Sequence, residues 1–363
     1  MTVHVVPYSP EHADAWSTFV AAHPNRAAGH LTAVFELERV TSGALNRSVL
    51  LQEDGQLRGV VPLFETRWKD LRVFPVRALS SGTYLRGGPL FDAALGERHR
   101  RHLLKHLVAH LDEQAAALGV DQVRISFPTV VGERPAVEVH GYLPLRHYGF
   151  RETNVVALLA DLRCDEDALF ANLERPRRVD ISRCRASGGE VRPIETRDEW
   201  MRAYELNVQT LGGKAYSREA LGVMWDRFVA EGHAIALGVY ASGAPASVVL
   251  VTTVGTAAYY WCGFNAYPAP IPGTSTVALW EAMLLCKRLG IPIFELGSLE
   301  FDSPKQIRIG NFKTTFGLRP VYALGGVRRV RQVRGALLDV TRVIAVALRS
   351  RIRRRDRGGD PAV

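Results

Sequence analysis

Residues 234–262 read AIALGVYASGAPASVVLVTTVGTAAYYWC, and this stretch decides the fold. Three runs rich in alanine, valine, leucine and aromatic residues are separated by two turn signals, Ser242 with Gly243 and Gly255 with Thr256. Apolar runs joined by short glycine-containing turns are typical of neighbouring antiparallel strands. We therefore predict strands at 234–240, 246–254 and 257–262.

A helix and a fourth strand are predicted directly after this meander. A loop rich in proline and glycine, 265–273, leads to a helix over 275–289. Gly290 ends that helix, because glycine favours the left-handed conformation that closes a helix. The apolar stretch 293–296 then reads as a strand.

The first half of the chain repeats this order. Its predicted elements are strands at 48–53, 57–66 and 71–79, a helix over 96–118 and a strand at 121–127. The pair Leu118-Gly119 precedes the last strand here, as Leu289-Gly290 does in the second half. The pattern predicts two copies of one meander–helix–strand unit, with a junction near 160–165 and a further helical segment at 166–186.

Composition agrees with two folded units. The chain has 363 residues, of which 47% are hydrophobic and 23% charged, which excludes a disordered protein and fits about two domains of ~150 residues. Its four cysteines form no C-x-x-C pair, so neither a zinc site nor a disulfide framework is indicated. Four histidines share one predicted helix stripe, but it lies in an arginine-rich segment with few carboxylates, and no metal site is predicted. They are His99, His102, His106 and His110.

Four short strings occur in order along the two predicted units. They are GGPL at 87–90, RRVDISRCRASGGEV at 177–191, LWEA at 279–282 with FELG at 294–297, and NFKTTFG at 311–317. In this order they resemble the Fem-type (FemAB-like) aminoacyltransferases. The resemblance implies an α/β (α+β) fold of two tandem GNAT-like domains, 1–160 and 161–322, each a mixed sheet flanked by helices. It leaves 323–363 as a basic tail.

The resemblance also implies an enzyme that forms amides. In that family an acceptor amine attacks the ester carbonyl of an aminoacyl-tRNA, and the acceptor is a cell-wall precursor or another amine-bearing small molecule. No cofactor is expected, since aminoacyl-tRNA is the co-substrate, and covalent catalysis is not needed because the aminoacyl ester is already activated. Two alternatives stay open: an acyl-CoA-dependent N-acyltransferase of the same fold, and a non-catalytic protein that binds a membrane surface.

Lys313 is the candidate catalytic residue, with Phe312 beside it. An ammonium held near the reacting carbonyl would stabilise the developing oxyanion, and the resemblance places the family's signature lysine at this position. Binding of a tRNA phosphate is another role that a lysine here could fill. The alternative from the residues alone is a surface lysine between two core aromatic residues, Phe312 and Phe316.

The loop before the second predicted helix argues against coenzyme A in the second domain. Enzymes of this fold that use acyl-CoA cradle its pyrophosphate on consecutive backbone N–H groups between a strand and a helix. The loop 264–274 contains Pro268, Pro270 and Pro272, and proline has no N–H to offer.

Five arginines in the segment 175–185 form a candidate tRNA-binding face, since phosphates attract arginine and the family has a basic helix here. They are Arg175, Arg177, Arg178, Arg183 and Arg185. The alternative is a solvated helix face. Candidate substrate-binding residues in the second unit are Lys214, Tyr216, Trp261 and Asn265, although alternation along the strand also suits Trp261 to the core. In the first unit the candidates are Gly87 and Gly88, in a loop that could hold an anion or be an ordinary turn.

Charge is concentrated at the end of the chain. The net charge is +9, yet residues 325–363 hold eleven arginines, no lysine and three aspartates, which leaves the rest nearly neutral. Apolar residues near helical spacing within 327–357 predict a basic amphipathic helix for a membrane surface or RNA, with packing on the first domain as the alternative. Without a signal peptide or an apolar stretch of ~20 residues, we expect a cytoplasmic protein, with the inner face of the membrane as a second location.

Overall fold

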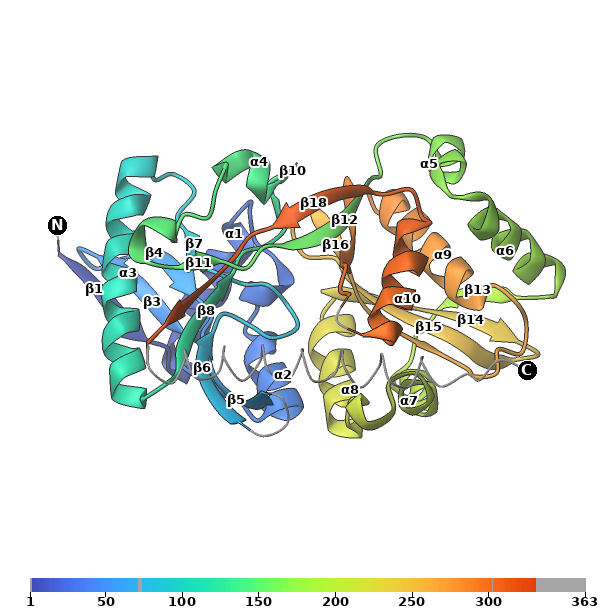
Figure 1. Cartoon of the computed structure of the whole chain (residues 1–363), viewed down its shortest axis with the longest axis horizontal. Helices are drawn as coiled ribbons and strands as arrows, with labels where there is room; N and C mark the ends of the chain where they lie inside the picture. Colours follow the sequence, from blue (N-terminus) through green and yellow to red (C-terminus); the bar gives the residue numbers. More distant parts are fainter. Residues whose placement is uncertain (1, 71–73, 302, 331–363) are drawn as a thin grey trace, which may run out of the picture.

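The computed structural model describes residues 2–70, 74–301 and 303–330, and Figure 1 shows them as two α/β units side by side. The predicted amphipathic helix lies almost wholly outside these residues. Its first residues, at 327–329, belong to a strand instead. Within the described ranges, no helix is both long and apolar enough to cross a bilayer.

The first unit contains two larger sheets. Strands β1 (Val3–Pro7), β3 (Val49–Glu53), β4 (Gln56–Val61) and β7 (Leu90–Phe91) form one sheet in the order β1-β3-β4-β7. The other has the order β11-β19-β8-β6-β5-β2, built from β11 (Arg151–Glu152), β19 (Gly325–Arg329), β8 (Gln122–Ser126), β6 (Phe74–Ser80), β5 (Phe64–Asp70) and β2 (Leu45–Asn46). The small pair β9 (Val130–Val131) and β10 (Arg134–Pro135) lies apart from both.

The helices of the first unit are α1 (Ala13–Ala22), α2 (Ala33–Ser42), α3 (Glu97–Leu118) and α4 (Ala136–His140). The predicted helix over 96–118 is confirmed as α3, which Gly119 ends at φ +61°. The strand predicted at 57–66 is wrong as a single element. It divides at Pro62 into β4 and β5, which join different sheets, since proline cannot donate to a ladder.

The second unit is built on one seven-stranded sheet in the order β13-β14-β15-β16-β17-β12-β18. Its strands are β12 (Val155–Asp161), β13 (Glu190–Pro193), β14 (Ala234–Ala241), β15 (Ala244–Thr252), β16 (Ala257–Asn265), β17 (Ile293–Ser298) and β18 (Arg319–Ala323). The meander predicted at 234–262 is confirmed as β14, β15 and β16. All neighbours are antiparallel except β16 and β17, which are parallel.

The helices of the second unit are α5 (Glu166–Asn172), α6 (Arg175–Ala186), α7 (Arg197–Leu211), α8 (Arg218–Met224), α9 (Thr274–Arg288) and α10 (Pro304–Thr314). The helical segment predicted at 166–186 is therefore two helices, because a new helix starts at Arg175 with Pro176 in its first turn. Helix α9 is the most buried, packed against β14, β15 and α6.

The hydrogen-bond ladders place the boundaries between units differently from the prediction. Strand β12, which precedes the predicted boundary at 160/161, pairs with β17 and β18 of the second sheet. Strand β19, in the predicted tail, pairs with β8 and β11 of the first sheet. The chain therefore returns to its first unit at Gly325. Pairing between distant strands carries no local sequence signal, which explains the difference.

The β15–β16 turn of the second unit fits tightly against the first. Gly255, at φ +82°, lies against the main-chain carbonyl of Arg26, where a Cβ would clash. The neighbouring Thr256 hydroxyl donates a hydrogen bond to the carbonyl of Gly132. This turn fixes the two units against each other close to the site described next.

Candidate active site

The parallel strands β16 and β17 separate and leave a gap in the second sheet. Their ladder joins 257–259 to 293–295, with Tyr259 opposite Glu295 as its last pair. Beyond this pair, β16 continues beside β15 while β17 runs beside β12. A polar side chain placed there can reach the interior of the sheet.

Lys313 of α10 occupies this gap. Its Nζ donates a hydrogen bond to the main-chain oxygen of Ser298 at 3.0 Å and lies 6.0 Å from the centre of the Tyr260 ring. A Cβ on Gly297 would be 3.4 Å from this Nζ, so the glycine leaves room for the ammonium. Burial lowers the pKa of Lys313, and Glu300 and Glu295 oppose that shift. The ammonium is therefore a stronger acid than an exposed one.

Glu295 is a buried carboxyl group in the same gap. It is only 6% exposed, and its Oε1 accepts a hydrogen bond of 2.8 Å from the hydroxyl of Thr129. Burial raises the pKa of Glu295, while Arg86, the Thr129 hydrogen bond and Lys313 lower it. A carboxyl group in these surroundings can gain or lose a proton nearer neutral pH than one in water.

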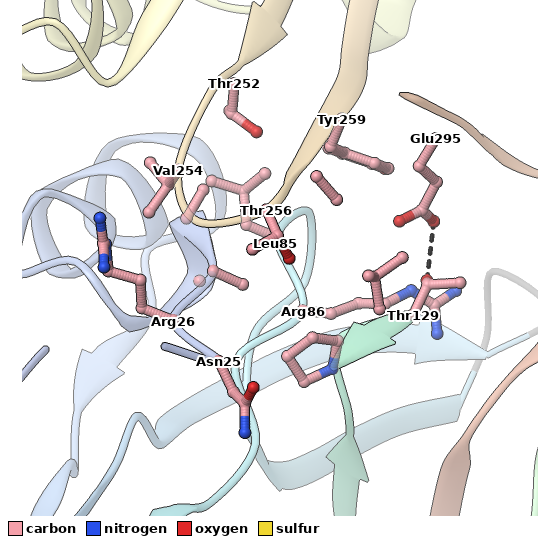
Figure 2. Close-up of a pocket in the computed structure, with 16 residues that line it drawn as sticks. Asn25, Arg26, Leu85, Arg86, Thr129, Thr252, Val254, Thr256, Tyr259 and Glu295 are labelled. Carbon is pink, nitrogen blue, oxygen red and sulfur yellow. Dashed lines mark hydrogen bonds between the residues drawn. The ribbon is translucent and has the colours of Figure 1, made fainter. Parts of the chain in front are cut away.

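Two side chains of the first unit reach the same place, as Figure 2 shows. Thr129 comes from the segment after β8, and Arg86 from the loop before β7. The Nη2 atom of Arg86 donates to the Ser298 hydroxyl at 2.9 Å, so Ser298 contacts both Arg86 and Lys313. The site is thus built by both units.

A cavity of about 50 Å³ lies between the units beside Glu295 and Tyr259. Its wall also contains the 25–29 segment, Arg86 and the β15–β16 turn. Burial, followed by the charge of Glu295, raises the pKa of Tyr259 far above its usual value. Tyr259 therefore stays a neutral hydrogen-bond donor, and the space suits a small polar group such as an amine or a carbonyl.

The NFKTTFG string has three structural tasks. Phe312 and Phe316 pack with their ring centres 5.4 Å apart and join the apolar core beneath α10, while Lys313 points into the gap. Phe312 also lies 5.0 Å from the guanidinium of Arg177, so its contacts with Phe316 and Arg177 are packing contacts. Gly317, at φ +66°, lies against the carbonyl of Asn172.

Replacing Gly317 by alanine should destabilise the protein strongly. The new methyl group would overlap the Asn172 carbonyl in a left-handed conformation that alanine disfavours. We expect a loss of about 2 kcal/mol or more in the free energy of unfolding. Urea denaturation measures it, with Gly213→Ala as the control, because a Cβ at Gly213 would meet nothing within 4 Å. Equal stability of the two variants would contradict this packing.

The predicted arginine face lies on α6, but most of its arginines have partners. Arg177 pairs with Asp180 at 2.8 Å, Arg185 pairs with Glu281 at 2.7 Å, and Arg178 donates to the carbonyl of Ala171 at 3.1 Å. Arg175 and Arg183 are exposed. The surface of α6 thus presents the exposed side chains of Arg175 and Arg183. Arg185 is also exposed, although it forms an ion pair.

The other candidate residues fall into different surroundings. Lys214 is exposed, while Trp261 is buried in the core with its ring 5.1 Å from Phe228. Asn265 accepts hydrogen bonds from Ser247 and Ser275 at 2.7 and 2.8 Å, which ties β15, β16 and α9 together. Of this group only Tyr216 faces the other unit, with its ring 5.7 Å from that of Tyr84.

Gly87 and Gly88 allow close packing in the first unit. Gly88 has φ +70°, and a Cβ there would be 2.9 Å from the carbonyl of Ser126. A Cβ on Gly87 would meet the Gly29 carbonyl at 2.9 Å and the ring of Pro62 even closer. This loop closes the gap between the parallel strands β6 and β8. There the main-chain N–H of Ser81 donates a hydrogen bond of 3.0 Å to the carbonyl of Arg124. The open gap therefore belongs to the second unit.

A carboxylate occupies the start of α9, where coenzyme A would need a phosphate cradle. The carboxylate of Asp180 accepts a hydrogen bond of 3.0 Å from the hydroxyl of Thr276, in the first turn of α9. Gly273, which precedes the helix, lies against the main-chain oxygen of Asp180. Helix α6 thus covers this terminus with the ion pair of Arg177 and Asp180, and Arg177 also donates to the Thr276 hydroxyl at 3.0 Å.

Sequence reasoning missed Glu295, Arg86 and Thr129 as members of the site. Glu295 did carry a signal, because a carboxylate between Phe294 and Leu296 in a buried strand needs a special environment. Arg86 and Thr129 carried none, because only the contact between the units brings them to β17.

Comparisons with solved structures identify the fold. The crystal structure of FemX matches with a TM-score of 0.64 at 16% sequence identity, over 92% of this chain and 99% of that chain. A tandem GNAT protein from the clavulanic acid biosynthesis pathway matches with a TM-score of 0.53 at 15% identity, over 91% and 99% of the two chains. This chain has the tandem GNAT fold.

The structure of L-PGS from Bacillus licheniformis also matches, with a TM-score of 0.57 at 13% identity, over 93% of this chain and 98% of that chain. No protein-family model and no curated protein matches the sequence. The predicted fold class, two tandem GNAT-like domains with mixed sheets and flanking helices, is confirmed. Identities this low show the fold, and function must be argued from the site.

Proposed function

We propose that this protein is an acyltransferase that moves an aminoacyl group from aminoacyl-tRNA to the amine of a small-molecule or cell-wall-precursor acceptor. The observation that carries the proposal is the half-buried Lys313 ammonium in the gap between β16 and β17, near the buried carboxyl of Glu295. One group can stabilise negative charge and the other can accept a proton, as an attack by an amine on an ester requires.

The chemistry balances with groups at this site. The acceptor nitrogen forms a bond to the ester carbonyl carbon, and Lys313 stabilises the negative charge on the carbonyl oxygen. Glu295 takes a proton from the attacking nitrogen. The carbon–oxygen bond to the tRNA ribose then breaks, and the ribose oxygen gains a proton from Lys313, whose pKa burial has lowered. Proton exchange with water restores both side chains.

Contacts between the units support an acceptor site at their interface. The cavity beside Glu295 opens between the two units, and Tyr84 and Tyr216 face each other across the same interface. Arg86 holds the hydroxyl of Ser298, whose carbonyl holds Lys313, so the first unit helps to orient the catalytic ammonium. We propose that the acceptor amine enters along this interface.

Helix α6 is the proposed contact for the tRNA. Arg175 and Arg183 are exposed there, and the neighbouring Arg185 remains accessible within its ion pair. The covered start of α9 disfavours acyl-CoA as the donor, because the ion pair of Arg177 and Asp180 already occupies the first turn of this helix. Since aminoacyl-tRNA is a cytoplasmic molecule, we propose that the reaction takes place there.

A single experiment separates the two donors. Purified protein is incubated with a metabolite extract and either total aminoacyl-tRNA or a mixture of acyl-CoAs, and new amides are identified by mass spectrometry. We expect products that depend on charged tRNA and disappear after ribonuclease treatment. Amides formed from acyl-CoA without tRNA would refute the proposed donor, and no product from either donor would favour a non-catalytic protein.

A further inference from the structure

A second, much larger cavity lies in the first unit and plays no part in the proposed transfer reaction. Its volume is about 920 Å³, within the range of cavities that hold small organic ligands. It lies between the first turns of α3, strand β7, the segment after β8 and the chain around α4. Its wall meets that of the smaller cavity only at Asn25 and Pro128.

Most polar side chains of this wall are those of arginine and histidine. Arg100 and Arg101 of α3 line it together with His23, His140 and His147. Glu97 is the single carboxylate among the lining residues, and it is already paired with Arg101 at 2.6 Å. The charge of Arg100 is therefore not balanced within the cavity.

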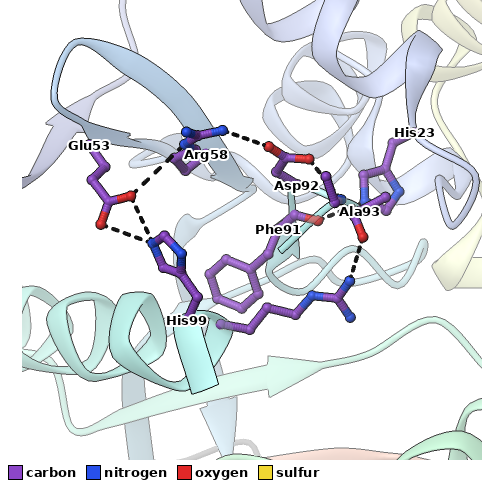
Figure 3. Close-up of polar contacts among 9 residues, drawn as sticks. His23, Glu53, Arg58, Phe91, Asp92, Ala93 and His99 are labelled. Atoms are coloured by element: carbon purple, nitrogen blue, oxygen red, sulfur yellow. Dashed lines mark hydrogen bonds and ion pairs between the residues drawn. The ribbon is translucent and has the colours of Figure 1, made fainter. Parts of the chain in front are cut away.

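Among the described residues, a main-chain oxygen and no acid holds the side chain of Arg100. Its Nη2 donates to the carbonyl of Ala93 at 2.8 Å, while its buried Nε has no hydrogen-bond partner among the described residues. Figure 3 shows how neighbouring polar groups fix the wall, with His23 bonded to the carbonyl of Phe91 at 2.7 Å. Asp92 forms an ion pair with Arg58 at 3.0 Å, so Arg58 neutralises the charge of Asp92.

Two histidines lie near Arg100 without a compensating carboxylate in the wall. Burial lowers the pKa of His140, and the charge of Arg100 lowers it further. Burial also lowers the pKa of His23, and Arg100 adds to that effect. The fully buried His30 lines the same cavity, and its Nδ1 accepts a hydrogen bond of 3.0 Å from the main-chain N–H of Ala27. Such an arrangement leaves donors ready for an anion.

The remainder of the wall is apolar and partly open to water. Leu104 and Phe127 are buried within it, whereas Val139 and Tyr142 are 43% and 44% exposed at the segment around α4. Large apolar side chains that stay exposed beside a cavity gain stability when a ligand covers them. The cavity thus combines a cationic part with an apolar part.

We propose that this cavity binds a small amphipathic anion, with its carboxylate or phosphate head at Arg100 and His140 and its apolar body against Leu104, Phe127 and Tyr142. A guanidinium forms paired hydrogen bonds with either kind of head group. The site is separate from Lys313 and Glu295, so the protein carries a binding function in its first unit besides the transfer reaction in its second.

Calorimetric titration of the full chain with decanoate, decyl phosphate and inorganic phosphate tests the proposal. We expect at least one decyl ligand to bind, and to bind more than tenfold tighter than inorganic phosphate, since each buried CH₂ adds to affinity. Binding of decanoate alone or decyl phosphate alone identifies the head group. If neither decyl ligand binds, or if inorganic phosphate binds as tightly, the proposal is wrong.

Two variants locate the ligand in the cavity. Arg100→Met should weaken binding of the decyl ligand by roughly tenfold or more, because it removes a charged hydrogen-bond donor. Tyr142→Ala should weaken binding of the decyl ligand and leave binding of inorganic phosphate unchanged. Because the side chain of Tyr142 is exposed, this variant should fold normally. Arg98→Met is the matched control, because Arg98 is exposed on the same helix and does not line the cavity. Equal effects of Arg98→Met and Arg100→Met would overturn the assignment.

Discussion

Lys313→Met should lower the rate of aminoacyl transfer by about 10²–10³-fold, the usual cost of losing one group that stabilises an oxyanion. Methionine fills nearly the same space but has neither charge nor hydrogen-bond donor. Burial already lowers the pKa of Lys313, so removing its charge should leave the protein as stable as before. Single-turnover kinetics with aminoacyl-tRNA and acceptor measures the rate.

Lys305→Met is the matched control for this result. Lys305 lies on the same helix, is exposed and donates a hydrogen bond of 2.7 Å to the carbonyl of Thr210 instead of Ser298. We expect this variant to keep nearly full activity. A Lys313→Met protein that folds normally and transfers at the wild-type rate would rule out the catalytic assignment.

Glu295→Gln should lower the rate by about 10²-fold or more, the usual contribution of a general base. The amide oxygen of glutamine can still accept the hydrogen bond from Thr129, so the local structure should be retained. Glu300→Gln is the control, because Glu300 is exposed and also acts on the charge of Lys313. If the two variants lose activity equally, Glu295 is not the base.

The pH dependence gives this prediction a second measurement. The wild-type rate should rise with pH as Glu295 loses its proton at a pKa above that of an ordinary carboxyl group, and fall as Lys313 loses its proton below that of an ordinary lysine. Glu295→Gln should lose the acidic limb and keep the alkaline one. An unchanged acidic limb in this variant would contradict the role of Glu295 as a base.

Stability should change with pH in a definite direction. The pKa of Glu295 is raised in the folded state, so its contribution is fully present below the unfolded pKa and is lost as pH rises through the folded value. Glu295→Gln has no such loss. The melting temperature of the variant should therefore rise relative to that of the wild type between pH 5 and pH 8. Thermal unfolding at both pH values measures the difference.

Local patterns predicted most of the secondary structure because the responsible signals lie within a few residues. The turns after β14 and β15 and the glycines that end α3 and α9 act on their own neighbours. Helix α3 and the three strands of 234–262 were predicted nearly to their observed bounds. The division of 57–66 at Pro62 was missed, because its two halves join different sheets.

The candidate site was only partly accessible from the sequence. The resemblance of the NFKTTFG string to the family signature pointed to Lys313, whereas the residues alone equally suited a surface lysine between two core aromatic residues. Trp261 was selected as an aromatic residue at a strand end, and Gly87 and Gly88 as part of a glycine-rich loop, and the structure shows all three in packing contacts. Residue type and spacing do not determine which face of a strand, or which side of a loop, packs against another unit.

The sequence by itself determined the two repeated units, the order of their elements and the lysine that one motif carries, because these depend on short-range periodicity, turn chemistry and local strings. Only the tertiary structure decided that β12 and β19 pair as they do and that Arg86 and Thr129 reach Ser298 and Glu295. It also decided that the open gap lies in the second unit and the large cationic cavity in the first. These features arise where segments far apart in the chain meet, and the free energy of such contacts depends on packing and burial that no local window contains.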